Sequence, residues 1–145
     1  MDFASGDGPR LVVVGIDGSD TSMRAGAYAV GLTRRQNARL VCLFVRTTSP
    51  LIAASPAAVS AMREATDSVA AELRELVRVQ AAHLGINATF VDREGNPFTE
   101  IVRLADELRA DAVVIGASSK AGHRFVGSLA VHLVKAARWP VTVVP

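Results

Sequence analysis

The sequence contains very little cysteine and no pattern of metal ligands. Cys42 is the only cysteine among 145 residues, so an intrachain disulfide and a thiol metal cluster are both excluded. Cys42 lies within the apolar run LVCLFV, which predicts a buried, unreactive thiol. The three histidines, His83, His123 and His132, are scattered without the spacing of metal ligands. We therefore expect no metal site.

The sequence also lacks a large excess of charge of either sign. Sixteen basic residues stand against fourteen acidic ones, for a formal net charge of +2. A nucleic-acid-binding protein would be expected to concentrate basic residues on one face. The only basic doublet, Arg34 and Arg35, falls near the end of a predicted helix, where positive charge complements the helix dipole. We expect no nucleic-acid partner.

Long apolar runs are missing as well. No run approaches the roughly 20 residues that a membrane span requires, and the opening MDFASGDGPR has no apolar core of a signal peptide. We expect a cytoplasmic protein that does not bind membranes. Residues 1–9 are predicted to be a flexible N-terminal segment.

Strands and helices alternate through the rest of the chain. Half of the residues are hydrophobic, a globular composition for a chain of one-domain length. β-branched apolar runs predict five strands, at 10–17, 39–46, 87–93, 111–116 and 140–144. Helical spacing predicts helices at 22–36, 56–84 and 128–138, and a further one that opens at Asn96 and Pro97. This order predicts an α/β fold, a single doubly wound parallel sheet with helices on both faces.

The helix at 56–84 carries an apolar stripe at helical spacing. Ser55 and Pro56 occupy its expected N-cap and first-turn positions, and Gly85 ends it. The residues predicted to face the sheet are Val69, Leu73, Leu76, Val77, Gln80 and Leu84.

Ligands of such sheets bind beyond the carboxyl ends of the strands, where the winding direction reverses. The residues at these ends are Asp17, Val45 and Gly116. Gly116 opens the segment GASSKAGHRFVGS, which is richer in glycine, serine and basic residues than a simple connection requires. We predict that this segment is a loop that faces an anionic ligand.

Gly127 and Ser128 stand where the last helix begins. Unpaired amides and the helix dipole favour an anion there, and glycine lets a phosphate approach the backbone. Equally, the two residues could only cap the helix while Gly116 only turns the chain. Neither GxxxxGK[ST] nor GxGxxG occurs, which excludes the two common phosphate signatures.

Two segments resemble the universal stress protein family. The family's first strand, followed by D-x-S, appears as VVVGIDGSD, and its closing pattern appears as GSLAVHLVKAARWPVTVV. The resemblance covers residues 10–145 and implies one Rossmann-like domain with strand order 3-2-1-4-5. It also implies a regulatory protein of the stress response that binds ATP, with AMP or cyclic AMP as less favoured ligands and Mg²⁺ as an accompanying ion.

The family's ATP motif, G-x2-G-x9-G-[ST], is degenerate in this chain. Gly116 fills its first position, but Ser119 replaces the second glycine, and only seven residues separate Ser119 from Gly127. Lys120, His123 and Arg124 lie in this shortened loop and could add positive charge. The resemblance places adenine and ribose near Asp17 and Val45, and the phosphates near the loop and the last helix. The nucleotide-binding residues it implies are Gly15, Ile16, Asp17, Val45, Gly116, Ser118, Ser119, Gly127, Ser128, Leu129 and Ala130.

Other functions fit the sequence less well. A response-regulator receiver needs a lysine near the end of the fifth strand, and an ATP pyrophosphatase needs further catalytic residues. Asp17 is the one plausible buried acid, and no nucleophile and base form a pair, so we expect at most slow ATP hydrolysis. Two hypotheses remain: an ATP-binding regulatory protein, and a dimeric interaction module that has lost its nucleotide.

The last strand, 140–144, predicts how two copies would meet. The resemblance places it at an edge of the sheet, where an apolar strand exposes unpaired amides and carbonyls. Two copies related by a two-fold axis would pair these groups and bury Val141 and Val143. Alternatively, Pro145 and the loops cover the edge, and the protein is a monomer.

Overall fold

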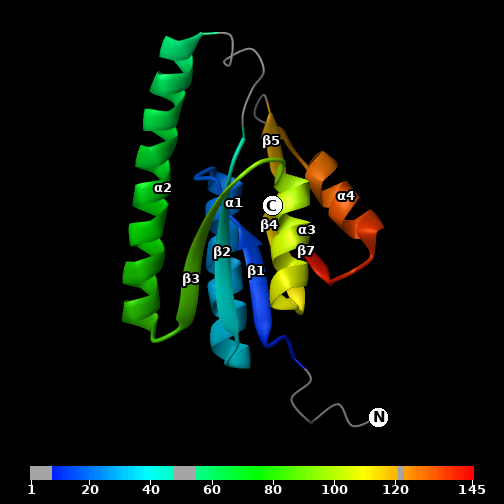
Figure 1. Cartoon of the computed structure of the whole chain (residues 1–145). Helices are drawn as coiled ribbons and strands as arrows, with labels where there is room; N and C mark the ends of the chain where they lie inside the picture. Colours follow the sequence, from blue (N-terminus) through cyan, green and yellow to red (C-terminus); the bar gives the residue numbers. More distant parts are fainter. Residues whose placement is uncertain (1–7, 48–54, 121–122) are drawn as a thin grey trace.

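The computed structural model describes residues 8–47, 55–120 and 123–145, with the backbone alone for 119–120 and 123–125. Most of the predicted N-terminal segment, residues 1–7, and the loop 48–54 lie outside this range. Strands and helices alternate along the chain, apart from two short strands that follow Gly116 directly (Figure 1). The elements are β1 Leu11–Gly15, α1 Asp20–Gln36, β2 Arg39–Arg46, α2 Pro56–Leu84, β3 Asn87–Glu94, α3 Pro97–Leu108, β4 Ala112–Gly116, β5 Ser118–Lys120, β6 His123–Phe125, α4 Gly127–Ala136 and β7 Val141–Val144.

Five strands form one parallel sheet in the order β3-β2-β1-β4-β7. Since β7 is the fifth strand of this sheet, the predicted order 3-2-1-4-5 is confirmed. The chain winds outward from β1 through β2 to β3, and then crosses back to β4 and β7. The reversal falls between β1 and β4, which makes their carboxyl ends the expected ligand site.

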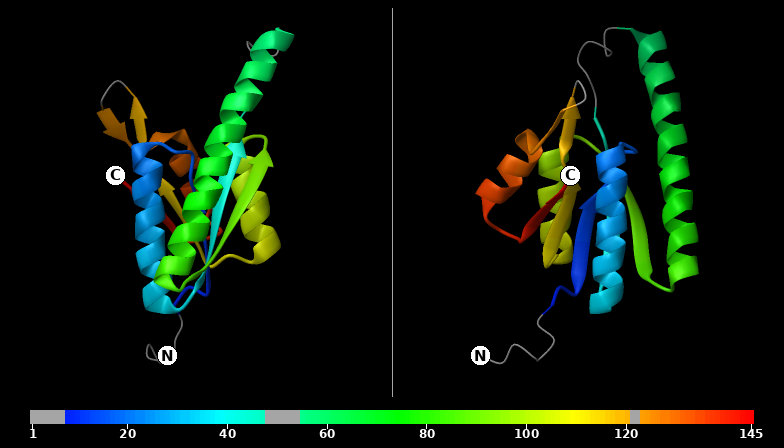
Figure 2. Two further views of the ribbon diagram at one scale, coloured as in Figure 1. Left: turned by 90° about the vertical axis from the view of Figure 1, so that its left-hand side faces the viewer. Right: turned by 180° about the vertical axis from the view of Figure 1, so that it is seen from behind.

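Helices cover both faces of the sheet (Figure 2). On one face, Ala25 and Ala29 of α1 and Leu73 of α2 pack against β1 and β2. On the other face, Leu104 of α3 and Leu133 of α4 pack against Val13, Val41 and Val113. The central strand is buried on both faces, as a nearly continuous apolar run predicts.

Side chains cap three of the four helices. Ser19 Oγ accepts a hydrogen bond from the Ser22 amide at 3.3 Å, and Asn96 Oδ1 accepts one from the Thr99 amide at 3.1 Å. Ser55 Oγ caps α2 in the same way. Gly85 ends α2 in the left-handed conformation, at φ 64°. These caps fix where α1, α2 and α3 begin relative to the strands before them.

Several details differ from the sequence-based prediction. β1 ends at Gly15 instead of residue 17, and α1 begins at Asp20 instead of residue 22. The segment after β4 was expected to be a loop, but β5 and β6 pair there as a short antiparallel hairpin. α4 begins at Gly127 and ends at Ala136, whereas the sequence predicted 128–138. On α2, Val69, Leu76 and Gln80 are more than one-third exposed, so their predicted contact with the sheet is wrong. Leu73 is buried as predicted, together with Ala70, which was not predicted.

The single cysteine is buried, as its apolar surroundings predict. Only 5% of Cys42 is exposed, and burial raises the pKa of its thiol to about 12. The thiol is therefore protonated and poorly nucleophilic at neutral pH. In the described part of the chain, no helix is both long and apolar enough to cross a membrane.

Candidate functional site

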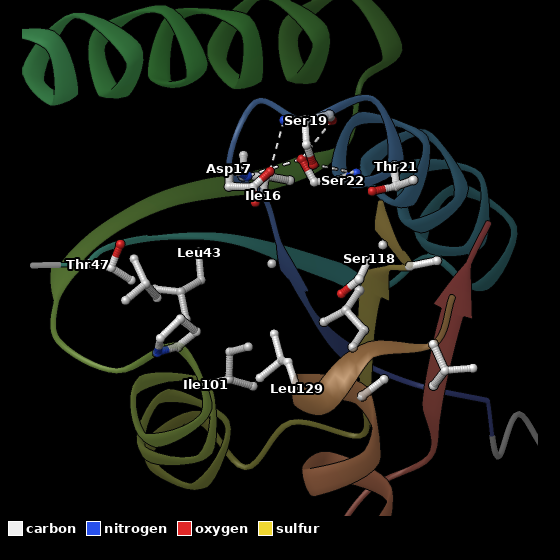
Figure 3. Close-up of a pocket in the computed structure, with 18 residues that line it drawn as sticks. Ile16, Asp17, Ser19, Thr21, Ser22, Leu43, Thr47, Ile101, Ser118 and Leu129 are labelled. Carbon is white, nitrogen blue, oxygen red and sulfur yellow. Dashed lines mark hydrogen bonds between the residues drawn. The ribbon is translucent and has the colours of Figure 1, made fainter. Parts of the chain in front are cut away.

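A pocket of about 380 Å³ opens at the carboxyl ends of β1, β2 and β4, at the predicted reversal of the winding (Figure 3). Ile16 and Asp17 lie on one side, and Ile101 and Leu129 lie opposite, with Ser118 between the two sides. Its volume is in the range of pockets that bind small molecules. The lining residues are Gly15, Ile16, Asp17, Ser19, Thr21, Ser22, Leu43, Val45, Thr47, Pro97, Ile101, Ile115, Gly116, Ala117, Ser118, Val126, Leu129 and Ala130.

A hydrogen-bonded turn between β1 and α1 holds Asp17 at the pocket. The Ser19 amide donates to Asp17 Oδ1 at 2.9 Å, and the Asp17 amide donates to Ser22 Oγ at 3.1 Å. The Ser22 hydroxyl in turn donates to the Ser19 carbonyl at 3.0 Å. Gly18 makes the turn possible because its φ of 88° is unfavourable for other residues. The turn therefore fixes the Asp17 carboxylate against the first turn of α1.

The same turn keeps Asp17 ionised. Asp17 is exposed, so the expectation of a buried acid at this position is wrong. Partial desolvation of the carboxyl alone would raise the pKa of Asp17, but hydrogen bonds from Ser19 and Ser22 outweigh that effect and lower the pKa below its ordinary value. At neutral pH the side chain is thus an acceptor with a full negative charge. It can accept hydrogen bonds from hydroxyl or amino groups of a ligand, and it repels phosphate.

Gly116 is required by close packing at the floor of the pocket. A Cβ atom there would stand 2.5 Å from the Thr21 carbonyl carbon and 2.7 Å from the Ser22 amide nitrogen. Both contacts are with backbone, so no side-chain rotation would relieve them. Glycine at the end of β4 thus lets α1 approach the sheet, and Gly116 does not have a positive φ.

Gly127 meets two separate constraints at the start of α4. Its φ is 82°, in the left-handed region that favours glycine, and a Cβ atom would collide with the Ser118 side chain. The close neighbour of Gly127 in this structure is therefore a serine hydroxyl at the pocket wall. Unlike the other three helices, α4 has no side chain capping its first amides.

Eight of the eleven residues predicted for the site line the pocket: Gly15, Ile16, Asp17, Val45, Gly116, Ser118, Leu129 and Ala130. Gly127 and Ser128 are not part of its wall, although they begin the helix that provides Leu129 and Ala130. The side chains of Ser119, Lys120, His123 and Arg124 lie outside what the structure describes. The structure thus brings together most of the predicted set, from four segments far apart in the sequence.

Sequence reasoning missed ten of the lining residues. Ser19, Thr21 and Ser22 come from the start of α1, and Pro97 and Ile101 come from the start of α3. The D-x-S pattern was a signal for Ser19. No sequence pattern showed that α3 would close the pocket, because that depends on how α3 packs against the end of β1. The other missed residues are Leu43, Thr47, Ile115, Ala117 and Val126.

The wall combines apolar surfaces with hydroxyl groups and a single carboxylate. Within the described residues, Asp17 is the only charged side chain that lines the pocket. Also within these residues, no three potential metal ligands come together. The pocket can hold a flat apolar ring of a ligand against Ile16, Leu43 or Val45. The carboxylate and hydroxyl oxygens of its wall can accept hydrogen bonds from hydroxyl groups of the same ligand.

The chain matches the universal stress protein family over residues 9–145. It is 31% identical over 139 residues to a universal stress protein of Methanocaldococcus jannaschii, covering 93% of this chain and 81% of that protein. The structure resembles universal stress protein UspA of Lactobacillus plantarum with a TM-score of 0.77 and 26% identity, covering 93% and 97% of the two chains.

A further structural neighbour was solved with a ligand. It is a universal stress protein family protein of Arabidopsis thaliana with AMP bound, with a TM-score of 0.68 and 21% identity. The match covers 94% of this chain and 91% of that one. At this level of identity the likeness shows a shared fold. The family match over almost the whole chain and the identity to the archaeal relative show that this chain belongs to the universal stress protein family.

Proposed function

We propose that this protein binds an adenine nucleotide, ATP in particular, and acts in regulation of the stress response rather than in catalysis. The observation that carries the proposal is the pocket at the carboxyl ends of β1, β2 and β4, with an ionised Asp17 on its wall. The AMP bound to the Arabidopsis neighbour supports the choice of an adenine nucleotide.

The walls of the pocket suggest how the nucleoside would lie. Ile16 and Val45 offer apolar contacts for the adenine ring. Asp17 would accept hydrogen bonds from ribose hydroxyls, since a charged carboxylate is a strong acceptor and the turn already fixes its position. This placement keeps the carboxylate away from the phosphates, which it would repel.

The beginning of α4 supports binding of the phosphates. Leu129 and Ala130 line the pocket, so the first turn of α4 faces it. Because no side chain caps the first amides, they and the helix dipole are available to an anion. Ser118 adds a hydroxyl donor beside Gly127. Any Mg²⁺ would arrive with the triphosphate.

We also propose that two copies pair through β7. β7 is an edge strand, and its only partner in the described chain is β4. Val131 and Val134 of the neighbouring α4 are also exposed, at 40% and 57%. An edge strand beside exposed apolar side chains is the kind of surface that another chain covers. The competing function, a nucleotide-free dimeric module, would share this interface. The degenerate motif at Ser119 favours that competing function.

Nucleotide binding is tested by replacing Val126, which lines the pocket ahead of α4 and is 55% exposed. We expect Val126→Glu to weaken Mg-ATP binding about tenfold, because a carboxylate would repel the outer phosphates and compete for the α4 amides. The Gln side chain of Val126→Gln has nearly the same size as Glu but carries no charge. This variant should bind ATP as the unmodified protein does. AMP, with one phosphate, should be affected less than ATP.

Calorimetric titration of nucleotide-stripped protein measures these affinities. Equal affinities of the Glu and Gln variants for ATP would contradict the placement of the phosphates. Absence of binding by the unmodified protein from micromolar to millimolar nucleotide would contradict the function itself and favour the nucleotide-free module.

A further inference from the structure

A second cavity lies at the amino ends of the strands, on the opposite side of the sheet's length from the nucleotide pocket at their carboxyl ends. It has a volume of about 440 Å³ and is formed where β1, β2 and β3 begin and where α1 and α2 end. Figure 1 shows these two helix ends at the end of the molecule away from β5. The five residues of β1 separate the two ends of the strands by about 16 Å. The lining residues are Arg10, Thr33, Arg34, Asn37, Ala38, Arg39, Leu84, Gly85, Ile86 and Asn87.

Three arginines line this cavity. Arg10 precedes β1, Arg34 belongs to the last turn of α1, and Arg39 begins β2. Across the described residues, no ion pair engages any of these three guanidinium groups. The nearby carboxylate of Asp111 accepts hydrogen bonds from the backbone amides of Arg10 and Leu11, both at 2.9 Å. All three arginines are exposed, and their positive charges lie around one recess.

The helix ends do not cancel this charge. The C-termini of α1 and α2 each contribute roughly half a negative charge, and the Asp111 carboxylate contributes one more, so three guanidinium groups leave an excess of about one positive charge. The last turn of each helix is also capped, since the Asn37 amide donates to the Arg34 carbonyl and the Gly85 amide donates to the Ala81 carbonyl. The side-chain amides of Asn37 and Asn87 provide further hydrogen-bond donors.

We propose that this cavity binds a small anion with two or more linked phosphate groups, the chemistry of inorganic pyrophosphate. Guanidinium groups match phosphate oxygens in a fork of parallel hydrogen bonds, and three such groups around one recess can engage oxygens of more than one linked phosphate group. A recess with arginines from three segments fits a compact anion better than an extended one. The site is independent of the nucleotide pocket, whose described wall contains no basic side chain.

The test is calorimetric titration of the full chain with pyrophosphate at constant ionic strength. We expect an Arg34→Gln, Arg39→Gln double variant to bind pyrophosphate at least about tenfold more weakly. Arg34→Gln alone should also weaken binding, and Arg35→Gln is its matched control, because it removes one charge from the same turn of α1 but does not line the cavity. Arg39→Lys, which keeps the charge but loses the fork, should give an intermediate loss.

Amide chemical shifts then locate the binding. We expect pyrophosphate-dependent shifts from Arg34 to Arg39 and at Asn87. These shifts should be the same whether or not the nucleotide pocket binds ATP. No binding of pyrophosphate, equal loss of binding in the Arg35 control, or shifts confined to Asp17 and Leu129 would each overturn the proposal. Sulfate that binds as tightly as pyrophosphate would also overturn it, because the cavity would then not select linked phosphates.

Discussion

A Val143→Pro variant is expected to be monomeric at micromolar concentration, where we expect the unmodified protein to form a dimer. The hydrogen bonds of β7 show which residues face the open edge. The Val113 amide donates to the Pro140 carbonyl at 3.0 Å, and the Ala117 amide donates to the Val144 carbonyl at 2.8 Å. Since backbone groups alternate along a strand, Thr142 also faces β4, while Val141 and Val143 direct their amides and carbonyls outward.

Proline at position 143 would remove one outward donor from each copy and leave the bonds to β4 intact. Two lost hydrogen bonds of about 1 kcal/mol each weaken the dimer roughly 30-fold, before any clash of the proline rings. Proline is tolerated in an edge strand when its missing amide would face solvent, so the fold should persist. Light scattering measures the mass.

Val143→Thr is the matched control, because it keeps the amide and nearly the same shape, and it should remain a dimer. A variant with proline that dimerises as tightly as the control would show that β7 is not the interface. An unmodified protein with the mass of one chain would contradict the dimer altogether.

Gly116→Ala is expected to destabilise the protein by about 1–3 kcal/mol, as overpacking of a rigid core does. The added methyl group would lie 2.5–2.7 Å from backbone atoms of Thr21 and Ser22. To relieve that overlap, the first turn of α1 must move away from β4. Because Thr21 and Ser22 also line the pocket, nucleotide affinity should fall together with stability. Urea unfolding and ATP titration of the same variant measure the two effects.

Gly15→Ala provides the comparison for Gly116. Gly15 lies at the same edge of the sheet and also lines the pocket, but its added Cβ would have ordinary contacts, the nearest at 3.6 Å from Ile115 Cγ2. We expect its stability to stay close to that of the unmodified protein. Equal stabilities of the Gly116→Ala and Gly15→Ala variants would contradict the close contact between α1 and the end of β4.

Much of the fold could be predicted because its signals are local. Buried parallel strands appear as short apolar runs, and Ser19, Ser55 and Asn96 each stand at the start of a helix. The order of the strands came from the resemblance to the family, and the structure bears it out. The positions of Asp17, Val45 and Gly116 at the pocket then follow, because the carboxyl ends of parallel strands lie at the same end of the sheet.

The remainder depended on contacts between segments that are distant in the sequence. The sequence indicated that Gly116 turns the chain, whereas the structure shows that it admits the backbone of α1. Likewise, helical spacing placed Val69 and Leu76 against the sheet, although both stay partly exposed where α2 lies over the edge strand β3. The β5–β6 hairpin had no pattern of its own, because each strand has only three residues.

Native mass spectrometry of the protein with a modest excess of Mg-ATP tests nucleotide binding and pairing together, since it counts chains and ligands in one particle. We expect a main species of two chains with two bound nucleotides, one in each pocket beside Asp17. The Val126→Glu variant should give two chains with fewer nucleotides. A spectrum in which the chains carry no nucleotide at any concentration of ATP or AMP would contradict the proposal that this pocket is an adenine-nucleotide site.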